Sequence, residues 1–197
     1  MSATHQEMEE FAAARGWTFD VSNRSLVETF RGEPFHPEQT ATLHNLLGGP
    51  YRDAWAVVFR YTQTVIIDDG FGRRGPANLS SWIAALLHMP TPVTRLDVLL
   101  RDPCRPAEED PSDPDVVVGD PRVDERFRIR GDDPRWAERV LSGPLAQVLL
   151  ADPVRPFRIS GTSALTWDRV SAGLPLDEID ATLDRLHAIA GHLVGGT

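Results

Sequence analysis

Three glycines, Gly70, Gly72 and Gly75, have the G-x-G-x-x-G spacing of dinucleotide-binding loops. In such loops the glycines let the backbone approach a pyrophosphate, whose charge is stabilised at the N-terminus of the following helix. Asp97 lies further along the chain, at roughly the spacing of a carboxylate that binds a ribose hydroxyl. A site of this kind requires Leu79–His88 to be a helix that packs on a parallel sheet.

The residues around this motif argue against a nucleotide site. Asp68 and Asp69 would place negative charge beside the phosphates. Pro76 and the polar residues after it delay the start of any helix, so its N-terminal N–H groups would lie too far from the glycines to bind a phosphate. Asp97 falls within an expected strand and not at its end. We therefore favour an exposed glycine-rich hairpin loop, and we retain a nucleotide- or phosphate-binding enzyme that uses residues 70–75 as an alternative.

Regularly spaced arginines form the second candidate site. The motif Phe-Arg-Ile-x-Gly occurs at 127–131 and again at 157–161. On a strand the arginines share one face, and if the two strands are neighbours, a phosphate or carboxylate can bind between them in a bidentate manner. The reading that we favour is a solvated face on which they pair with Asp124 or Glu125. The arginines of this candidate anion-binding module are Arg126, Arg128, Arg130 and Arg158.

No other group of residues indicates catalysis or metal binding. The histidines never occur as His-x-x-x-His or His-Glu-x-x-His, the spacings that place two metal ligands on one helix face. Cys104 lies between prolines in an acidic stretch, where neighbouring carboxylates disfavour the reactive thiolate. We therefore assign no catalytic residue, no metal site and no cofactor.

Charge and composition limit the partners and the compartment. The chain has 197 residues and a net charge of −9, and all 20 cationic side chains are arginine. An acidic protein binds nucleic acid and anionic membranes poorly, because both require clustered positive charge. The absence of lysine excludes a Schiff-base or P-loop lysine. A single cysteine, an acidic start and apolar runs too short to span a bilayer indicate a cytoplasmic protein.

The segment Arg122–Trp167 carries the clearest structural signal. It predicts a strand at 122–130, a helix over 134–150 and a second strand after that helix. Asp133 is a good N-cap for the helix, and Gly143-Pro144 kinks or breaks it. The segment is therefore a strand–helix–strand unit.

A C-terminal helix is predicted from about Pro175 to Leu193. Acidic residues in its first turn suit the helix dipole. Its apolar residues recur at helical spacing, and they are Ile179, Leu183, Leu186, Ile189, Ala190 and Leu193. We predict an α+β fold with a mainly antiparallel twisted sheet, the strand–helix–strand unit at 122–167, and this C-terminal helix packed on one face.

Shorter elements are predicted in the first half of the chain. A helix over 5–15 ends at Gly16, which is typical of a helix C-terminus. Gly48–Tyr51 predicts a turn, and the apolar alternation over 55–61 predicts a strand that faces a core.

The organisation around residue 100 is less regular. Leu79–His88 fits either a helix or a short strand buried on both faces. Pro90-Thr91-Pro92 separates this segment from a strand at Thr94–Arg101. Residues 102–115 are acidic and rich in proline, which predicts a solvated loop. We place this loop inside a single domain that spans residues 1–197.

Several stretches resemble a group of uncharacterised actinobacterial proteins. They are Trp82–Leu100, Val123–Arg130, Trp136–Leu141 and Phe157–Ile159. In that group a strand ends in a proline turn, and a later Phe-x-Val/Ile strand precedes a Trp/Phe-Ala-x-x-x-Leu helix. The resemblance implies a strand at 79–88 and supplies no activity and no site residue. This sequence departs from the group at Thr91–Thr94, where a Leu-Pro pair is more usual.

These observations favour a non-catalytic cytoplasmic protein over an enzyme. Its partner would be another protein or a second copy of the chain, with no nucleic acid and no membrane. The glycine-rich loop and the arginine module remain as alternative sites, the first for a nucleotide or phosphate and the second for an anion.

Overall fold

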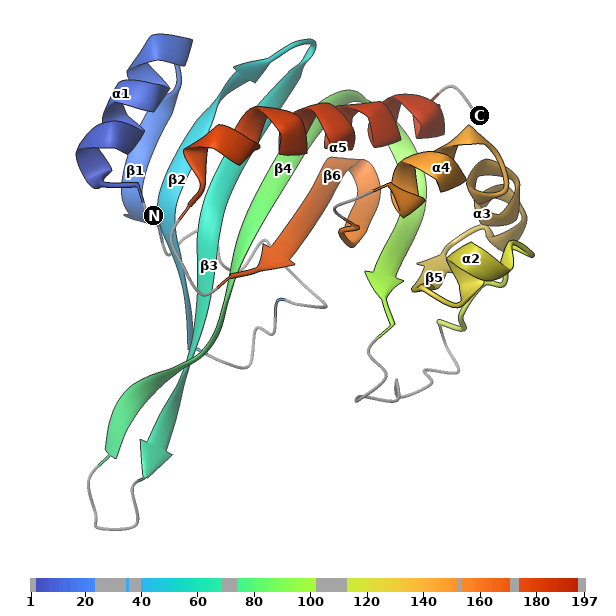
Figure 1. Cartoon of the computed structure of the whole chain (residues 1–197), viewed down its shortest axis with the longest axis horizontal. Coiled ribbons are helices and arrows are strands. Elements are labelled where there is room, and N and C mark those ends of the chain that lie inside the picture. Colours follow the sequence, from blue (N-terminus) through green and yellow to red (C-terminus); the bar gives the residue numbers. More distant parts are fainter. Residues whose placement is uncertain are drawn as a thin grey trace. The chain divides into compact units, whose positions relative to one another are not determined.

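The computed structural model describes residues 3–23, 35, 40–68, 74–101, 113–151, 154–170 and 174–194, and all statements below concern these residues. The strands are β1 (Thr18–Asn23), β2 (Thr40–Tyr51), β3 (Ala54–Asp68), β4 (Arg74–Leu100), β5 (Phe127–Gly131) and β6 (Phe157–Arg169). The helices are α1 (His5–Arg15), α2 (Pro121–Asp124), α3 (Pro134–Leu141), α4 (Pro144–Leu150) and α5 (Ile179–Val194). Neighbouring strands follow the order β1-β2-β3-β4-β5, and β6 also pairs with β4 (Figure 1). The predicted α+β fold with an antiparallel sheet is confirmed.

The chain divides into two compact units, which are described separately. The first comprises Met1–Ala85 with Asp168–Ile179, and the second comprises Leu86–Trp167 with Asp180–Thr197. β4 contributes its first part to one unit and its second part to the other. The single domain expected over the whole chain remains a prediction. Most of the predicted acidic loop, residues 102–112, lies outside the described residues.

Helix α1 in the first unit begins and ends where the sequence predicts. The Thr4 hydroxyl accepts a hydrogen bond from the backbone N–H of Glu7 at 3.2 Å, and the Glu7 carboxylate accepts one from the N–H of Thr4 at 2.7 Å. This reciprocal cap satisfies two N–H groups that the helix leaves open. Gly16 ends the helix with a φ of 65°, and Met8 and Ala12 are buried on its inner face.

The turn predicted at Gly48–Tyr51 is wrong, because these residues continue β2 and pair with β3. The chain turns instead at Arg52–Asp53. A side chain at Gly49 would place its Cβ 2.2 Å from Cδ1 of Trp17. The Trp17 indole packs against this glycine and donates from Nε1 to the carbonyl of Pro50 at 2.9 Å. The glycine therefore marks a close packing contact.

The strand predicted at 55–61 is present as part of β3. Phe59 and Tyr61 are buried as predicted, but Ala56, Val58 and Thr62 of the opposite parity are buried too, and Trp55 is 50 % exposed. Trp55 lies close to the turn at Arg52–Asp53 and pairs with Pro50.

Residues 79–88 form a strand and not a helix. They belong to β4, which also continues through Pro90-Thr91-Pro92, so the predicted break at 90–92 is wrong. Ala84 and Ala85 are both buried, as in a strand covered on both faces. Residues 90–92 are exposed, and the missing N–H groups of the prolines therefore leave no buried hydrogen bond unmade.

The second unit contains the strand–helix–strand segment with changed boundaries. The first strand is limited to β5, and the prediction of a strand at 122–126 is wrong because α2 occupies its start. Asp120 caps this helical turn by accepting a hydrogen bond from the N–H of Arg122 at 3.0 Å, and Pro121 occupies the first helical position. The helix predicted over 134–150 is broken into α3 and α4 at the expected glycine.

Helix α5 confirms the predicted C-terminal stripe, since all six predicted apolar residues are at most 4 % exposed. Leu186 and Ile189 on α5 line a cavity of about 10 Å³ together with Thr166 of β6, which places α5 against the sheet of the second unit. The guanidinium of Arg185 donates to the carbonyls of Val148 and Leu149 at 2.9 and 3.2 Å, at the C-terminal end of α4. None of the described helices is long and apolar enough to cross a membrane.

Candidate binding groove

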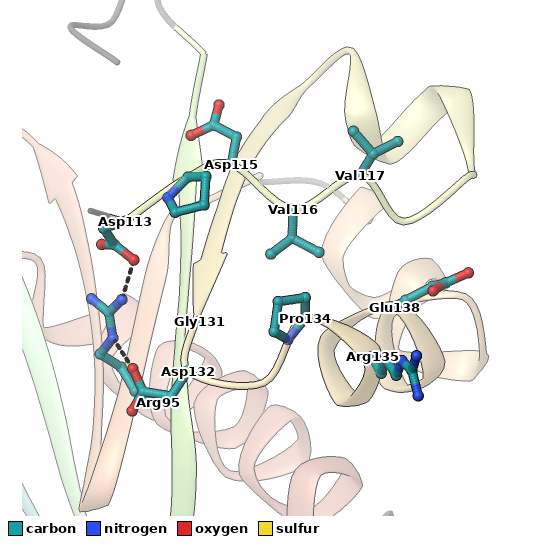
Figure 2. A pocket seen from close by; sticks show the side chains of 11 residues that line it. Arg95, Asp113, Asp115, Val116, Val117, Gly131, Asp132, Pro134, Arg135 and Glu138 are labelled. Atoms are coloured by element: carbon teal, nitrogen blue, oxygen red, sulfur yellow. Dashed lines mark hydrogen bonds and ion pairs between the residues drawn. The ribbon is translucent and has the colours of Figure 1, made fainter. Parts of the chain in front are cut away.

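An open groove with a volume of about 640 Å³ lies beside β5 in the second unit. Figure 2 shows the side chains that line it. One wall is the extended segment 113–118, which a hydrogen bond of 2.7 Å from the N–H of Val116 to the carbonyl of Ile129 holds against β5. The other wall is the start of α3. The groove is therefore built by three segments that are separate in the sequence.

The turn between β5 and α3 brings the backbone close to β4. Asp133 caps α3 with its side chain, and Pro134 occupies the first helical position. The N–H of Asp132 donates to the carbonyl of Arg95 at 3.3 Å. A Cβ on Gly131 would lie 2.8 Å from that same carbonyl oxygen, a distance that real Cβ atoms do not tolerate. The glycine thus allows the groove wall to pack directly on β4.

Arg95 of β4 holds the two walls together. Its Nε donates to Asp132 at 3.0 Å and its other nitrogens contact Asp113 and, at 3.3 Å, Asp97. Figure 2 shows the guanidinium between the carboxylates of Asp113 and Asp132. The hydrogen bond to Asp113 is the largest cause that raises the pKa of Arg95; burial opposes it, and Asp132 and Asp97 add to the rise. Arg95 is therefore a permanently charged clamp.

Asp97 lies between the two arginine-bearing strands. Its side chain is 5 % exposed and accepts a hydrogen bond from Nε of Arg158 at 2.7 Å. Asp97 pairs in register with Arg130 of β5, while β6 also pairs with β4. Figure 1 shows the second part of β4 flanked by β6 and β5. A joint anion site required β5 and β6 to be neighbours, so that Arg128 and Arg158 come together. Both strands pair with β4 instead, so this condition is not met.

Asp115 is shared by three arginines. Its carboxylate lies 3.4 Å from Nε of Arg128, 3.4 Å from Nε of Arg130 and 3.6 Å from Nη2 of Arg101. Arg128 is only 8 % exposed, so it does not lie on a solvated face. The expected partner Asp124 instead accepts hydrogen bonds from the backbone of the 113–118 wall and the residue after it.

The outcome for the four predicted arginines is mixed. Arg128 and Arg130 meet at Asp115, Arg158 is held by Asp97, and Arg126 is exposed. The sequence reasoning missed Arg95, Arg101, Asp113 and Asp115 as members of the site. The alternation of charge in Arg95-x-Asp97 and Asp113-x-Asp115 was a signal for charged side chains that share one face.

The centre of the groove is apolar. Pro134 and Val116 face each other across it, and Val117 stands beside them with 73 % of its surface exposed (Figure 2). Arg135 and Glu138 on α3 form its outer rim. The described residues contain no cluster of three metal-type ligands. Since the inner charged groups are engaged with one another, the arrangement is suited to noncovalent binding of a chain segment.

The structure provides no support for a nucleotide site at the glycine-rich loop 70–75. Gly70 and Gly72 lie outside the described residues, as does Cys104, and Gly75 belongs to β4. The nucleotide reading required a helix at Leu79–His88 on a parallel sheet, and that segment is an antiparallel strand. The proposed phosphate site thus lacks the helix N-terminus on which it depended.

The structure is thus that of an α+β protein whose second unit carries an open groove. The chain matches no family model and no curated protein. Its structure is similar to the crystal structure of the mycobacterial trehalose monomycolate transport factor A, TtfA, with a TM-score of 0.59 and 12 % sequence identity. The similarity covers 95 % of this chain and 90 % of that chain. At this identity the comparison shows a shared fold.

Proposed function

We propose that this protein is a non-catalytic binding protein and that the groove beside β5 holds a segment of a partner polypeptide. The observation that carries this proposal is that the charged and the apolar lining residues have different roles. Arg95, Asp113 and Asp115 are engaged in ion pairs that build the walls, while Val116 and Val117 present apolar surface at the centre. A polar rim around an apolar centre is the usual composition of a protein interface.

One further observation supports a binding role. The structural neighbour is described as a transport factor, and a protein that binds and assembles with others agrees with such a description. The sequence contains one cysteine, so no internal disulfide can form, and for this reason we propose that the protein acts in the cytoplasm. The partner is another protein or a second copy of this chain.

Selection from a random peptide library against the full chain tests the proposal. Peptides that occupy the groove should bind the wild type with measurable affinity and bind Val117→Asp at least about tenfold more weakly, because the substitution places a charge in the apolar centre. Val21→Asp is the matched control, since Val21 is also an exposed valine, at 51 %, but lies on β1 of the other unit. Fluorescence anisotropy gives the dissociation constants.

Four results decide between the possibilities. Equal loss of binding in Val117→Asp and Val21→Asp would place the peptide elsewhere, and an empty selection would contradict a peptide groove. Sedimentation of the free chain shows whether a second copy occupies the groove, in which case Val117→Asp should dissociate the oligomer. A saturable reaction that depends on one essential side chain would refute the non-catalytic role.

A further inference from the structure

We propose that the first unit binds the phosphoryl group of a small molecule through a row of polar side chains centred on Arg60 of β3. The row crosses three neighbouring strands, since Ser22 of β1 pairs in register with His44 of β2, and His44 pairs with Arg60. Directly paired residues place their side chains on the same face of a sheet. Figure 1 shows β1, β2 and β3 side by side. The site belongs wholly to the first unit and does not depend on the groove.

Two buried hydroxyl groups extend the row to β4. Nη2 of Arg60 donates to Oγ of Ser81 at 3.3 Å, and the hydroxyls of Thr62 and Ser81 lie 3.3 Å apart. Thr62 is 6 % exposed and Ser81 is 9 % exposed. Arg60, Thr62 and Ser81 therefore form one connected hydrogen-bond network that is largely shielded from water.

This network has more donors than acceptors. Each hydroxyl carries one proton, and one of the two protons is used between Thr62 and Ser81. Whichever hydroxyl donates, the second proton has no acceptor among the described residues. Nε of Arg60 is also buried and donates no hydrogen bond in the described structure. Because a buried donor without an acceptor is costly, the network is complete only when a further acceptor binds.

The charge of Arg60 favours an anion over water as this acceptor. The guanidinium is permanently cationic, and the hydrogen-bond partner that the described structure gives it is the neutral hydroxyl of Ser81. Desolvation, and then the charge of Arg60, lower the pKa of His44. An anion between His44 and Arg60 would therefore relieve an unfavourable pairing as well as accept hydrogen bonds.

A β-bulge brings His44 to this face. The pairing of β2 with β3 shifts between His44 and Leu47. Continued from Leu47 without that shift, the register would place His44 opposite Tyr61, on the other face of the sheet. Asn45 in the bulge has a φ of 54°, a left-handed conformation that costs energy for a residue with a side chain. Bulges of this kind re-aim side chains beside binding sites, and this one aligns His44 with Arg60.

A phosphoryl group fits this set of donors better than a carboxylate. The hydroxyl pair lies on one side of Arg60, and His44 lies on the other side, on β2. A phosphoryl group has three strong acceptor oxygens that point in different directions, whereas the two oxygens of a carboxylate lie in one plane. Ser22 at the end of the row is exposed, so the rest of the ligand extends towards solvent there.

Thermal denaturation of the full chain in inorganic phosphate and in acetate, at equal ionic strength, tests this inference. Phosphate at ten times its dissociation constant should raise the melting temperature by about 3–6 °C through linkage, and acetate should raise it by less than about 1 °C. Arg60→Gln should abolish the effect of phosphate. Arg15→Gln, which removes an exposed arginine from α1 of the same unit, is the control and should retain it. This comparison also removes the general stabilisation of proteins by phosphate.

The imidazole of His44 gives a readout that a purely structural network would not change. In proton–nitrogen NMR spectra, phosphate should shift the His44 ring resonances and raise the pKa of His44, because the anion offsets the charge of Arg60. The described residues paired with His44 are Ser22 and Arg60, and of these two Arg60 carries the charge. His5 of α1 is the control, and its resonances should not move. Ser81→Ala, which leaves Arg60 in place, should weaken phosphate binding at least about threefold.

The possible results separate this site from its alternatives. Equal stabilisation of the wild type and Arg60→Gln, or His44 resonances that phosphate does not move, would overturn the site and leave ordered water as the missing acceptor. A response to acetate as large as the response to phosphate would overturn the phosphoryl group in favour of a carboxylate. Val117→Asp in the groove should bind phosphate as the wild type does, so the failure of the groove and the failure of this site are distinguishable.

Discussion

Replacement of Asp97 by alanine should destabilise the second unit, because it removes a buried carboxylate from between two arginines. The Asp97 side chain is 5 % exposed and contacts Arg158 at 2.7 Å and Arg95 at 3.3 Å. Both guanidinium groups remain charged after the substitution and lose a partner in a region that water reaches only in part. Arg95 retains Asp113 and Asp132 after the substitution, whereas Arg158 loses a hydrogen bond of 2.7 Å from its Nε.

The magnitude follows from the exposure of the arginines. Removal of one partner of a fully buried ion pair costs about 3–5 kcal/mol. The side chains of Arg158 and Arg95 are 19 % and 29 % exposed, and solvent screening reduces the cost to about 2–3 kcal/mol. For a protein of this size such a change lowers the melting temperature by roughly 4–12 °C.

Urea denaturation followed by tryptophan fluorescence measures the change in unfolding free energy. Asp20→Ala is the matched control, because Asp20 is exposed on β1 and should change stability by less than about 0.5 kcal/mol. Arg158→Ala and the double variant complete a cycle in which a coupling energy of about 1–2 kcal/mol is expected between Asp97 and Arg158. A loss in Asp97→Ala no greater than in Asp20→Ala, or a coupling energy near zero, would refute the reasoning.

Two further substitutions test the first unit. Gly49→Ala should lower the unfolding free energy by about 2–3 kcal/mol, because its Cβ would lie 2.2 Å from the Trp17 ring. Gly48→Ala is the control and should cost less than about 1 kcal/mol, because the nearest neighbour of its Cβ lies at 3.6 Å. Equal losses of unfolding free energy in urea denaturation would contradict the contact. Desolvation, and then the charge of Arg60, lower the pKa of His44 below 6.5, so the unfolded chain takes up the proton first as the pH falls below 6.5, and stability is lost on acidification. His44→Gln should reduce this loss between pH 6.5 and 5, and an unchanged pH dependence of the melting temperature would contradict it.

The elements that could be predicted from the sequence are those with a complete local signal. Helix α5 has an apolar stripe of six residues, all of them buried, and Asp180 in its first turn. Helix α1 ends at Gly16, whose positive φ a glycine adopts without strain. In both cases residues near in sequence carry the information.

The failures have a tertiary cause. Gly49 was interpreted as part of a turn, but it lies in β2, where the ring of Trp17 leaves no room for a side chain. Residues 79–88 have helical spacing and nevertheless form a strand, because pairing within the sheet outweighs local periodicity. Neither contact is visible in the sequence around these residues.

The site was predicted less well than the fold for the same reason. The regular arginines of β5 were recognised, but their partner Asp115 was assigned to a solvated loop. Strand register decides which charges meet, as when Asp97 is placed opposite Arg130, and register depends on the whole sheet. Ion pairs between distant segments therefore require the structure.

The contact of Arg185 with α4 has a consequence for the order of folding. Helix α4 has only seven residues, too few to be stable alone in water. The carbonyls of Val148 and Leu149 near its C-terminus are satisfied by a guanidinium from α5, which the ribosome synthesises later. During translation α4 therefore gains this contact only once α5 has been synthesised, and we expect the segment between β5 and β6 to complete its packing after that point.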